Sequence, residues 1–267
     1  MSFTNLYKPP QPPHDSTPDD VYGPEPYDIN FVFPLRWEAL ENDVVKLTPF
    51  VPRSHGALYW SKFAPDRIEL TRHLPWAHTT LEAFLVCVEK DFRSDPNYVL
   101  LAVVDKTRAE EAPGLGGAIA GLVGFVETSK DNLRTEVGPV LTLRAYQRTH
   151  VTANAAGLLL RYAFGLPSDP VTPGLGLRRV QWTVFPGNEA SARAAKGLGF
   201  TEEGVMRWKW ILPETKEGKE PRAEDPVRGK GRDIIMFAIC WDDWENGVED
   251  IVKERMARSR DGIVSSS

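Results

Sequence analysis

The sequence predicts a mixed α/β fold built around a mostly antiparallel sheet. Strand-like and helical stretches follow one another in the order β–α–α–β–β–β–α–β–α–β–β. Several neighbouring strands are joined by hairpin-like connections, and few connections are long enough to carry a parallel crossover. Antiparallel hairpins mixed with a few helices are typical of an α+β architecture.

The composition is that of a folded chain. Of the 267 residues, 42% are apolar and 10% are aromatic, which is enough for a sizeable core in one large domain or two small ones. Acidic and basic residues are interspersed, and the formal net charge is −5. Because the basic stripe of a nucleic-acid-binding protein is missing, we expect no nucleic-acid partner.

The cysteines and the N-terminal segment indicate whether the protein has a metal site or disulfides and where in the cell it is located. Cys87 and Cys240 lie in apolar segments and have neither metal-ligand spacing nor the density of a disulfide scaffold. We therefore expect buried thiols and no metal. The N-terminus lacks the apolar segment of a secretory signal, and no apolar run reaches about 18 residues. These features predict a cytoplasmic protein without a membrane partner.

Residues 1–35 are predicted to be a proline-rich, extended segment, because such runs disfavour helices and ladders. This segment either lies against the domain or forms a tail. The folded domain is predicted to span residues 36–258 as a single unit, and residues 259–267 to be a C-terminal tail. The prolines of the first segment include Pro9, Pro10, Pro12, Pro13, Pro18, Pro24 and Pro26.

The first half of the domain contains apolar runs with the spacing of strands and helices. A helix over 79–92 is indicated by one apolar face and by Thr79 as a candidate N-cap. The turn "PGLGG" at 113–117 indicates a hairpin between two strands. The expected elements are a strand at 44–49, a helix at 52–63, the helix at 79–92, and strands at 97–106 and 117–129.

The second half begins with a strand at 134–143 that is interrupted by Pro139, which cannot donate to a ladder. A stripe of apolar residues at helical spacing follows at 151–165, and Gly165 ends it. The remaining expected elements are a strand at 178–185, a helix at 189–198, strands at 203–212 and 232–241, a charged loop at 213–231 and a C-terminal helix at 244–260.

The helix at 189–198 has a clear start and end. Asn188 can cap its first turn, and Gly199 can adopt the left-handed conformation that ends it. In the next strand, Met206, Trp208 and Trp210 share one face. We interpret that face as a core stripe, with the lining of an acceptor pocket as the alternative.

The motifs of this half closely resemble the RimJ/RimL-type branch of the GNAT superfamily of N-acetyltransferases. That branch shows a strand, N-x-x-S, a helix, L-G-F, E-G-x-x-R and then R-D before a strand with a tryptophan-rich end. The resemblance covers about residues 40–247. The matching residues are Asn188, Ser191, Leu198, Gly199, Phe200, Glu203, Gly204, Arg207, Arg232, Asp233 and Trp244.

The resemblance implies a GNAT-like acyl-CoA N-acyltransferase fold, in which one parallel strand pair splays apart to admit acetyl-CoA. The strands of this pair would be 136–143 and 180–185. The backbone of the first strand would pair with the pantetheine arm, through Val140, Leu141, Thr142 and Leu143.

The turn before the helix at 151–165 would hold the pyrophosphate, because clustered N–H groups and a helix dipole favour an anion. This turn departs from the family pattern, since His150 and Thr152 stand where glycine or alanine is usual. The histidine must either point away or contact a phosphate itself. The implied ligands are Gln147, Arg148, Thr149, His150, Val151, Thr152 and Ala153.

The resemblance also places the chemistry. Glu136 matches the carboxylate that acts as general base, and Ser191 matches the serine that donates to the coenzyme A sulfur. Asn188 would reach the pantetheine amides, and a backbone N–H near Val140 or Leu141 would stabilise the tetrahedral intermediate. The alternatives are a solvent-facing Glu136 and a Ser191 that serves only the helix cap.

These observations predict direct acetyl transfer from acetyl-CoA to a primary amine of a small molecule or a protein N-terminus. His150 as the base is disfavoured by its distance from the thioester. His73 and His78 lie in a region that shapes the acceptor site in the family, although both also suit the surface. We expect a homodimer, and the loop at 213–231 either covers the acceptor site or binds a partner. The alternative is a catalytically inactive GNAT-fold binding or scaffolding module.

Overall fold

The computed structural model describes residue 4 and residues 17–264. Its strands form one sheet in the order β1-β2-β3-β4-β6-β8-β7, and β5 pairs with β3. The parallel pair is β4 with β6, whereas the other pairs are antiparallel. The predicted fold class is therefore confirmed. The strands are β1 (Val45–Pro49), β2 (Val99–Asp105), β3 (Ala118–Ser129), β4 (Arg134–Val137), β5 (Leu141–Thr142), β6 (Arg179–Val184), β7 (Thr201–Leu212) and β8 (Lys230–Cys240).

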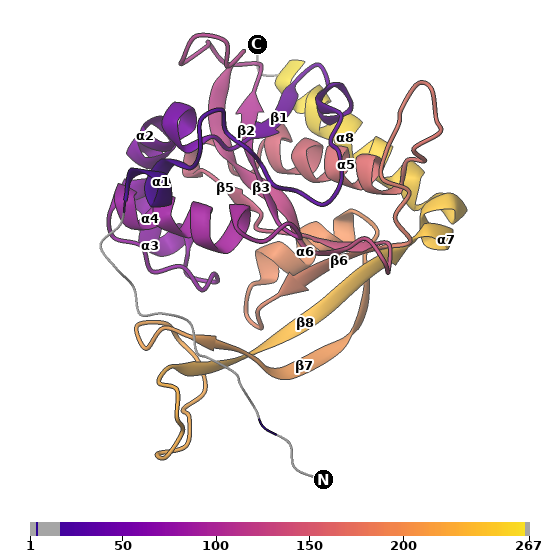
Figure 1. The fold of residues 1–267 in the computed structure, drawn as a ribbon. Helices are drawn as coiled ribbons and strands as arrows, with labels where there is room; N and C mark the ends of the chain where they lie inside the picture. The colour runs from indigo at the N-terminus through magenta and orange to yellow at the C-terminus, as the bar shows by residue number, and fades with distance from the viewer. Residues whose placement is uncertain (1–3, 5–16, 265–267) are drawn as a thin grey trace.

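Helices lie on both sides of this sheet. Figure 1 shows α1 to α4 gathered on one side and α5 with α8 on the other. Short 3-10 or π turns extend or connect these helices. The main helices are α1 (Pro18–Tyr22), α2 (Pro52–Phe63), α3 (Arg67–Leu70), α4 (Leu81–Cys87), α5 (His150–Phe164), α6 (Glu189–Gly197), α7 (Trp241–Asp243) and α8 (Glu249–Val264). None of the helices in the described ranges is long and apolar enough to cross a membrane.

Helix α5 is the buried centre of its layer. Its apolar stripe, including Leu158 and Leu159, is buried as expected from the spacing. The other side of α5 packs against α8, where a Cβ on Gly157 would meet the sulfur of Met256 at 2.4 Å. Glycine therefore lets the two helices approach closely. The result is a rigid platform that fixes the position of the first turn of α5.

The N-terminal segment lies against the domain. Tyr27 Oη donates to Glu89 Oε1 at 2.8 Å, and Val32 N donates to the carbonyl oxygen of Pro96 at 2.8 Å. The expectation of a wholly extended segment is wrong at Pro18, where α1 begins with a capping box on Thr17. Proline suits the first turn of a helix, where its missing N–H has no partner to lose. The earlier prolines and the last three serines lie outside the described residues.

Helix α4 begins one residue later than expected. Thr80, rather than Thr79, is the N-cap, because its Oγ1 accepts from Ala83 N at 3.1 Å. The predicted helix continues beyond Cys87 as a π-helical turn over Val88–Arg93. Adjacent threonines offer the same cap chemistry, so the sequence alone did not distinguish them.

Strand β7 contradicts the predicted core stripe. It is the edge strand of the sheet, and Met206, Trp208 and Trp210 are 42%, 52% and 38% exposed. The pairing with β8 is interrupted between Met206 and Trp210, and Trp208 has a positive φ of 55°. Its ring lies over Gly231, where a Cβ would meet it at 2.0 Å. The alternating pattern of residues predicted one buried face for Met206, Trp208 and Trp210. No neighbouring element of the described chain buries these three side chains, so they stay exposed.

Candidate active site

The two parallel strands part directly after Glu136. β4 pairs with β6 from Arg134 to Glu136, and the pairing then stops. Pro139 follows, and beyond it β5 pairs with β3 and not with β6. Because proline has no N–H, the ladder cannot continue through it. The predicted divergence of the strands 136–143 and 180–185 is therefore present.

Beyond the divergence, one edge of β5 is turned away from β3. Leu143 N donates to the carbonyl oxygen of Ala120 at 2.9 Å, and Leu141 pairs with Leu122. Since backbone groups alternate along a strand, those of Thr142 and Val140 face the opposite edge. Of the four residues predicted to line the pantetheine arm, Val140 and Thr142 thus turn their backbone groups away from β3, whereas Leu141 and Leu143 are engaged with it.

The turn into α5 presents polar groups to solvent. Gln147, Arg148 and Thr149 are exposed, and Arg148 has a positive φ of 61°. Thr149 caps the helix through Val151 N at 3.3 Å. The predicted phosphate-binding turn therefore lies at a helix N-terminus, where N–H groups point outward.

Two contacts link this turn to β5. Gln147 Nε2 donates to the carbonyl oxygen of Thr142 at 3.2 Å, and the hydroxyls of Thr142 and Thr152 lie 2.7 Å apart. Thr152 and the next residue, Ala153, are both partly buried. Thr152, which departs from the family pattern, therefore links the first turn of α5 to β5.

His150 points into the protein. Its Nε2 lies 3.1 Å from Asp105 Oδ1, and both side chains are buried. Burial alone would raise the pKa of Asp105, but hydrogen bonds from His150 and Thr107 outweigh it and lower that pKa. The imidazole therefore takes the first of the two predicted alternatives, because it points away from the turn and toward Asp105. Its position under the first turn of α5 makes it a support of that turn.

Glu136 lies at the point of divergence and is partly buried. Thr183 Oγ1 donates to Glu136 Oε1 at 2.5 Å. Burial raises the pKa of Glu136 to about 7, with the nearby Glu127 adding to the effect, while Thr183 and Lys209 oppose it. A carboxyl group with a pKa near neutrality can both accept and release a proton at physiological pH. Thr183 and Lys209 were not predicted from the sequence.

Ser191 and Asn188 lie on the other face of β6. Trp182 Nε1 donates to Ser191 Oγ at 2.9 Å, and Ser191 N donates to Asn188 Oδ1 at 3.2 Å. Trp182 and Thr183 are adjacent in β6, so their side chains point to opposite faces of the sheet. Glu136 and Ser191 therefore flank the divergence from its two faces.

The 213–229 loop reaches the helices across the Glu136 face. Lys216 Nζ donates to the carbonyl oxygen of Thr71 at 2.8 Å. The guanidinium carbon of Arg232 lies 5.0 Å from the ring centre of Phe185, which directly follows β6. The loop thus spans from the β7–β8 hairpin to the connection between α3 and α4, below those helices in Figure 1. The sequence indicated the loop but not this contact.

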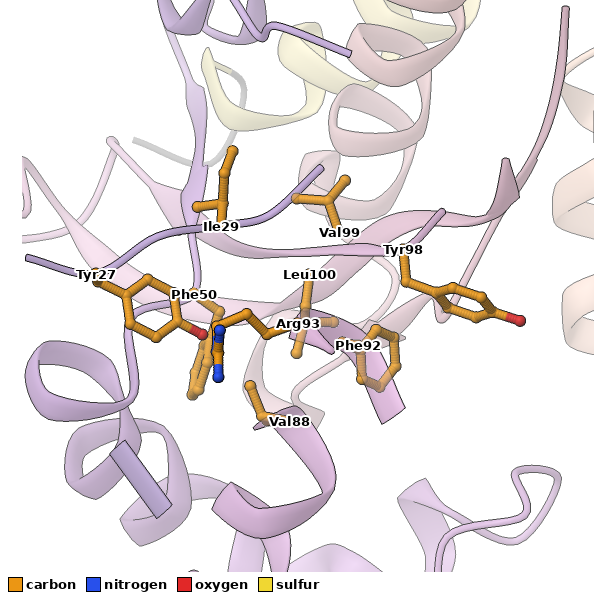
Figure 2. Close-up of a pocket in the computed structure, with 9 residues that line it drawn as sticks. All are labelled: Tyr27, Ile29, Phe50, Val88, Phe92, Arg93, Tyr98, Val99 and Leu100. Carbon is orange, nitrogen blue, oxygen red and sulfur yellow. The ribbon is translucent and has the colours of Figure 1, made fainter. Parts of the chain in front are cut away.

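Two other features lie away from the divergence. A cavity of about 10 Å³, lined by residues that include Tyr27, Phe92 and Leu100, holds no more than a water molecule (Figure 2). In the described part of the chain, one group of potential metal ligands lies within 4.8 Å, namely Cys240, Asp242 and Asp243. Asp243 accepts from Cys240 N at 2.9 Å as a helix cap. The expected absence of a metal stays a prediction.

Comparison with known families decides the identity of the fold. A family model described as an acetyltransferase (GNAT) domain matches residues 45–201, more than half of the chain. The chain belongs to the GNAT superfamily. Its enzyme class is therefore that of the acyl-CoA-dependent N-acetyltransferases, which disfavours the inactive-module alternative. No curated protein matches the sequence.

Solved structures of acetyltransferases share this GNAT fold. A T. thermophilus protein assigned as an acetyltransferase is 25% identical, with a TM-score of 0.62, covering 84% of this chain and 98% of its own. The microcin C7 self-immunity acetyltransferase MccE, solved with acetyl-CoA and AMP, is 18% identical, with a TM-score of 0.55 and coverage of 74% and 93%. A Salmonella typhimurium acetyltransferase that modifies the N-terminal serine of ribosomal protein L7/L12 is 16% identical, with a TM-score of 0.54 and coverage of 74% and 96%.

Proposed function

We propose that this GNAT enzyme transfers the acetyl group of acetyl-CoA directly to a primary amine, with Glu136 as the general base. The observation that carries the proposal is the position of Glu136 at the point where β4 and β6 part, where Thr183 holds its carboxylate. Burial there raises its pKa to about 7. An amine must lose a proton before or during its attack, and a base with a pKa near the working pH is suited to accept it. The MccE complex with acetyl-CoA supports the choice of donor.

The residues around the divergence fit acetyl-CoA. The backbone edge of Val140 and Thr142 that faces away from β3 suits the amides of a pantetheine arm, although the side-chain amide of Gln147 already donates to the carbonyl oxygen of Thr142. The first turn of α5, with Arg148 beside it, suits a pyrophosphate. Asn188 is available near the same path. When bound, acetyl-CoA supplies a thioester whose carbonyl is open to attack by the amine.

The proposed roles of the side chains follow from the two faces of β6. Glu136 takes the proton of the acceptor ammonium on one face. On the other face, the hydroxyl of Ser191 accepts from Trp182, so its own proton is available for the departing thiolate. Among the two predicted donors to the tetrahedral oxygen, we favour Val140 N–H, because Leu141 is paired with β3.

The acceptor is a primary amine of a small molecule or of a protein N-terminus. The Salmonella acetyltransferase, which modifies an N-terminal serine, supports the second class. The contact between Lys216 and Thr71 supports a covered acceptor site, which suits a small acceptor. A homodimer and a cytoplasmic location stay predictions.

Calorimetric titration with acetyl-CoA tests the cofactor part of this proposal. We expect micromolar binding by the wild type and weaker binding by Arg148→Ala, because a charge-assisted contact to phosphate is lost. Lys130→Ala is the matched control, since Lys130 is an exposed cation in the β3–β4 turn. A folded wild type that does not bind acetyl-CoA would contradict the proposed function.

A further inference from the structure

Two cations on the acceptor face lack a carboxylate partner. Lys216 Nζ donates to the backbone oxygen of Thr71 at 2.8 Å and to its hydroxyl at 3.2 Å. Arg232 Nη2 donates to the backbone oxygen of Glu217. Within residues 17–264, no ion pair joins either cation to an acid, whereas Lys219 and Lys230 pair with Asp233 and Glu220. Two partly buried positive charges are therefore left without neutralisation.

The surroundings make this arrangement costly. Burial lowers the pKa of Lys216, and the charge of Arg232 lowers it further. Burial, together with Arg72 and Arg232, also lowers the pKa of His73. Like charges brought together out of water destabilise a protein unless an anion joins them. The fold thus holds a positive potential that nothing in the described chain offsets.

Unpaired polar atoms gather in the same region. Three buried side-chain atoms of the described residues have no hydrogen-bond partner, and they include Arg232 Nε and His78 Nε2. The third, Tyr59 Oη, belongs to an aromatic cluster in which the rings of Tyr59 and His78 both pack on Phe84. Tyr59 is a fully buried core residue, whereas the charge of Lys216 acts on His78 and that of Arg232 acts on Lys216. Because buried polar atoms are nearly always paired, the unpaired atoms of His78 and Arg232 indicate a place where a ligand supplies partners.

The acids of this region do not neutralise the two cations. Glu69 and Glu217 act on His73, and Asp91 acts on His78. Glu217 approaches Arg72 at 3.8 Å, and both of these side chains are exposed. The pKa of Lys216 responds only to burial and to Arg232. The positive character therefore centres on Lys216 and Arg232.

This pair of cations lies along the same face of β6 as the proposed base. Arg232 covers the ring of Phe185. Thr183 pairs with Met236 of β8, and Arg232 precedes Met236 by four residues on that strand, so alternation points their side chains to the same face. Thr183 in turn holds Glu136. A molecule on this face can therefore place one end at Glu136 and the other at the cations.

We infer that the acceptor is a small zwitterionic amine, whose carboxylate or phosphate group is bound by Lys216 and Arg232 while its amine faces Glu136. This inference rests on the proposed function and adds the substrate class. The bridge from Lys216 to Thr71 closes the site on the side of the loop, which favours a small molecule over a folded protein. A charge-assisted hydrogen bond to each cation gives the selectivity.

Matched pairs of acceptors test the inference in steady-state assays with acetyl-CoA. The pairs are β-alanine with propylamine, O-phosphoethanolamine with ethanolamine, and L-serine with L-serinamide. We expect the anionic member of at least one pair to have a kcat/KM about 10-fold or more higher, as expected for one hydrogen bond to a charged group. The three pairs distinguish a carboxylate from a phosphate. Equal kcat/KM values within every pair would overturn the inference, and so would a preference for acidic peptide N-termini over all the small amines.

Variants of the cations provide the second arm. Arg232→Gln and Lys216→Gln are expected to raise the KM of the anionic acceptor about 10-fold and to raise the KM of the uncharged amine much less. Arg232→Lys, which keeps the charge, is expected to recover part of the loss. Arg228→Gln is the control, because Arg228 is an exposed cation of the same loop. An equal loss for charged and uncharged amines would show that Arg232 only supports the fold.

A third arm does not depend on activity. The protein is saturated with coenzyme A, so that the phosphate-binding turn is filled, and inorganic phosphate or acetate is added as the probe. We expect a rise in Tm in the wild type that is lost in Arg232→Gln. If the protein binds acetyl-CoA but neither anion raises its Tm, the anion site is refuted and the proposed function stands. If the protein does not bind acetyl-CoA, the proposed function itself fails.

Discussion

The two faces of β6 differ in how their polar groups are satisfied. On the α6 face, Trp182, Ser191 and Asn188 form a chain of neutral hydrogen bonds. On the opposite face, Glu136 has a raised pKa, and Arg232 has an unpaired buried nitrogen. The first face is held by neutral helix-cap and side-chain hydrogen bonds. The second face carries the charged groups of the site, and so we expect it to decide the acceptor.

The largest effect should come from Glu136→Gln, which removes the base from the charged face. We expect kcat to fall by about 10² to 10⁴, the usual range for a positioned acid or base. The affinity for acetyl-CoA should be unchanged, because the substitution leaves the other face intact. Steady-state kinetics and calorimetry check the two parts. Wild-type kcat in this variant would remove Glu136 from the mechanism.

Glu136→Gln should also have a higher free energy of unfolding than the wild type at alkaline pH. The pKa of Glu136 is about 7 in the folded chain and 4.5 ordinarily. The folded state therefore binds the proton more tightly, and the free energy of unfolding falls as the pH rises from 4.5 to 7. Glu136→Gln should recover up to about 3 kcal/mol above pH 7 and almost nothing at pH 4. Thermal unfolding at both pH values measures this, and an equal change at both would contradict it.

His150→Ala tests whether the supporting layer under α5 acts on stability alone. Loss of the imidazole leaves the buried carboxylate of Asp105 with its hydrogen bonds from Thr107 but without the His150 partner, which costs about 1 to 3 kcal/mol. Urea unfolding should show this loss, while folded protein should bind acetyl-CoA within about 3-fold of the wild type. His150→Gln, which keeps a donor, is the milder variant. A large loss of acetyl-CoA affinity in a folded variant would return His150 to the phosphate site.

Ser191→Ala should have a smaller effect, confined to the α6 face. We expect kcat to fall about 10-fold, at or below the low end for acid catalysis, because a thiolate leaves readily even without a proton. Trp182→Phe is the matched control, since it removes the same hydrogen bond but keeps the hydroxyl. If both variants lose the same activity, Ser191 only positions the helix.

Thr183→Val should give the smallest effect on activity. It tests most directly whether Glu136, on the charged face of β6, is the group that titrates. Thr183 stabilises the carboxylate of Glu136, so its removal should raise that pKa above about 7. The acid limb of the plot of kcat/KM against pH should move up by about 1 unit, and the rates should converge above pH 8. Thr183→Ser should restore the limb. An unmoved limb would mean that another group titrates in the assay.

The sequence predicted most of the elements proposed to bind acetyl-CoA, but fewer of the residues proposed to bind the acceptor. Pro139 indicated the interrupted strand and Asn188 the helix cap, because both act through local backbone chemistry. Glu136 could be predicted from its place before the interruption. Lys216 and Arg232 could not, since their meeting depends on how a long loop crosses to Thr71. Trp208 was misplaced because alternation along β7 does not tell which face a neighbour covers.

The attachment of the N-terminal segment has a consequence for where this chain can be cut. The family match begins at residue 45, yet Phe31 stacks on the buried ring of Phe125 at 6.4 Å. Tyr27 also donates to the buried carboxylate of Glu89. A truncated chain that begins at the homology boundary would expose this aromatic surface and leave Glu89 with fewer donors. The folded unit therefore extends N-terminal of the family match and includes Tyr27 and Phe31.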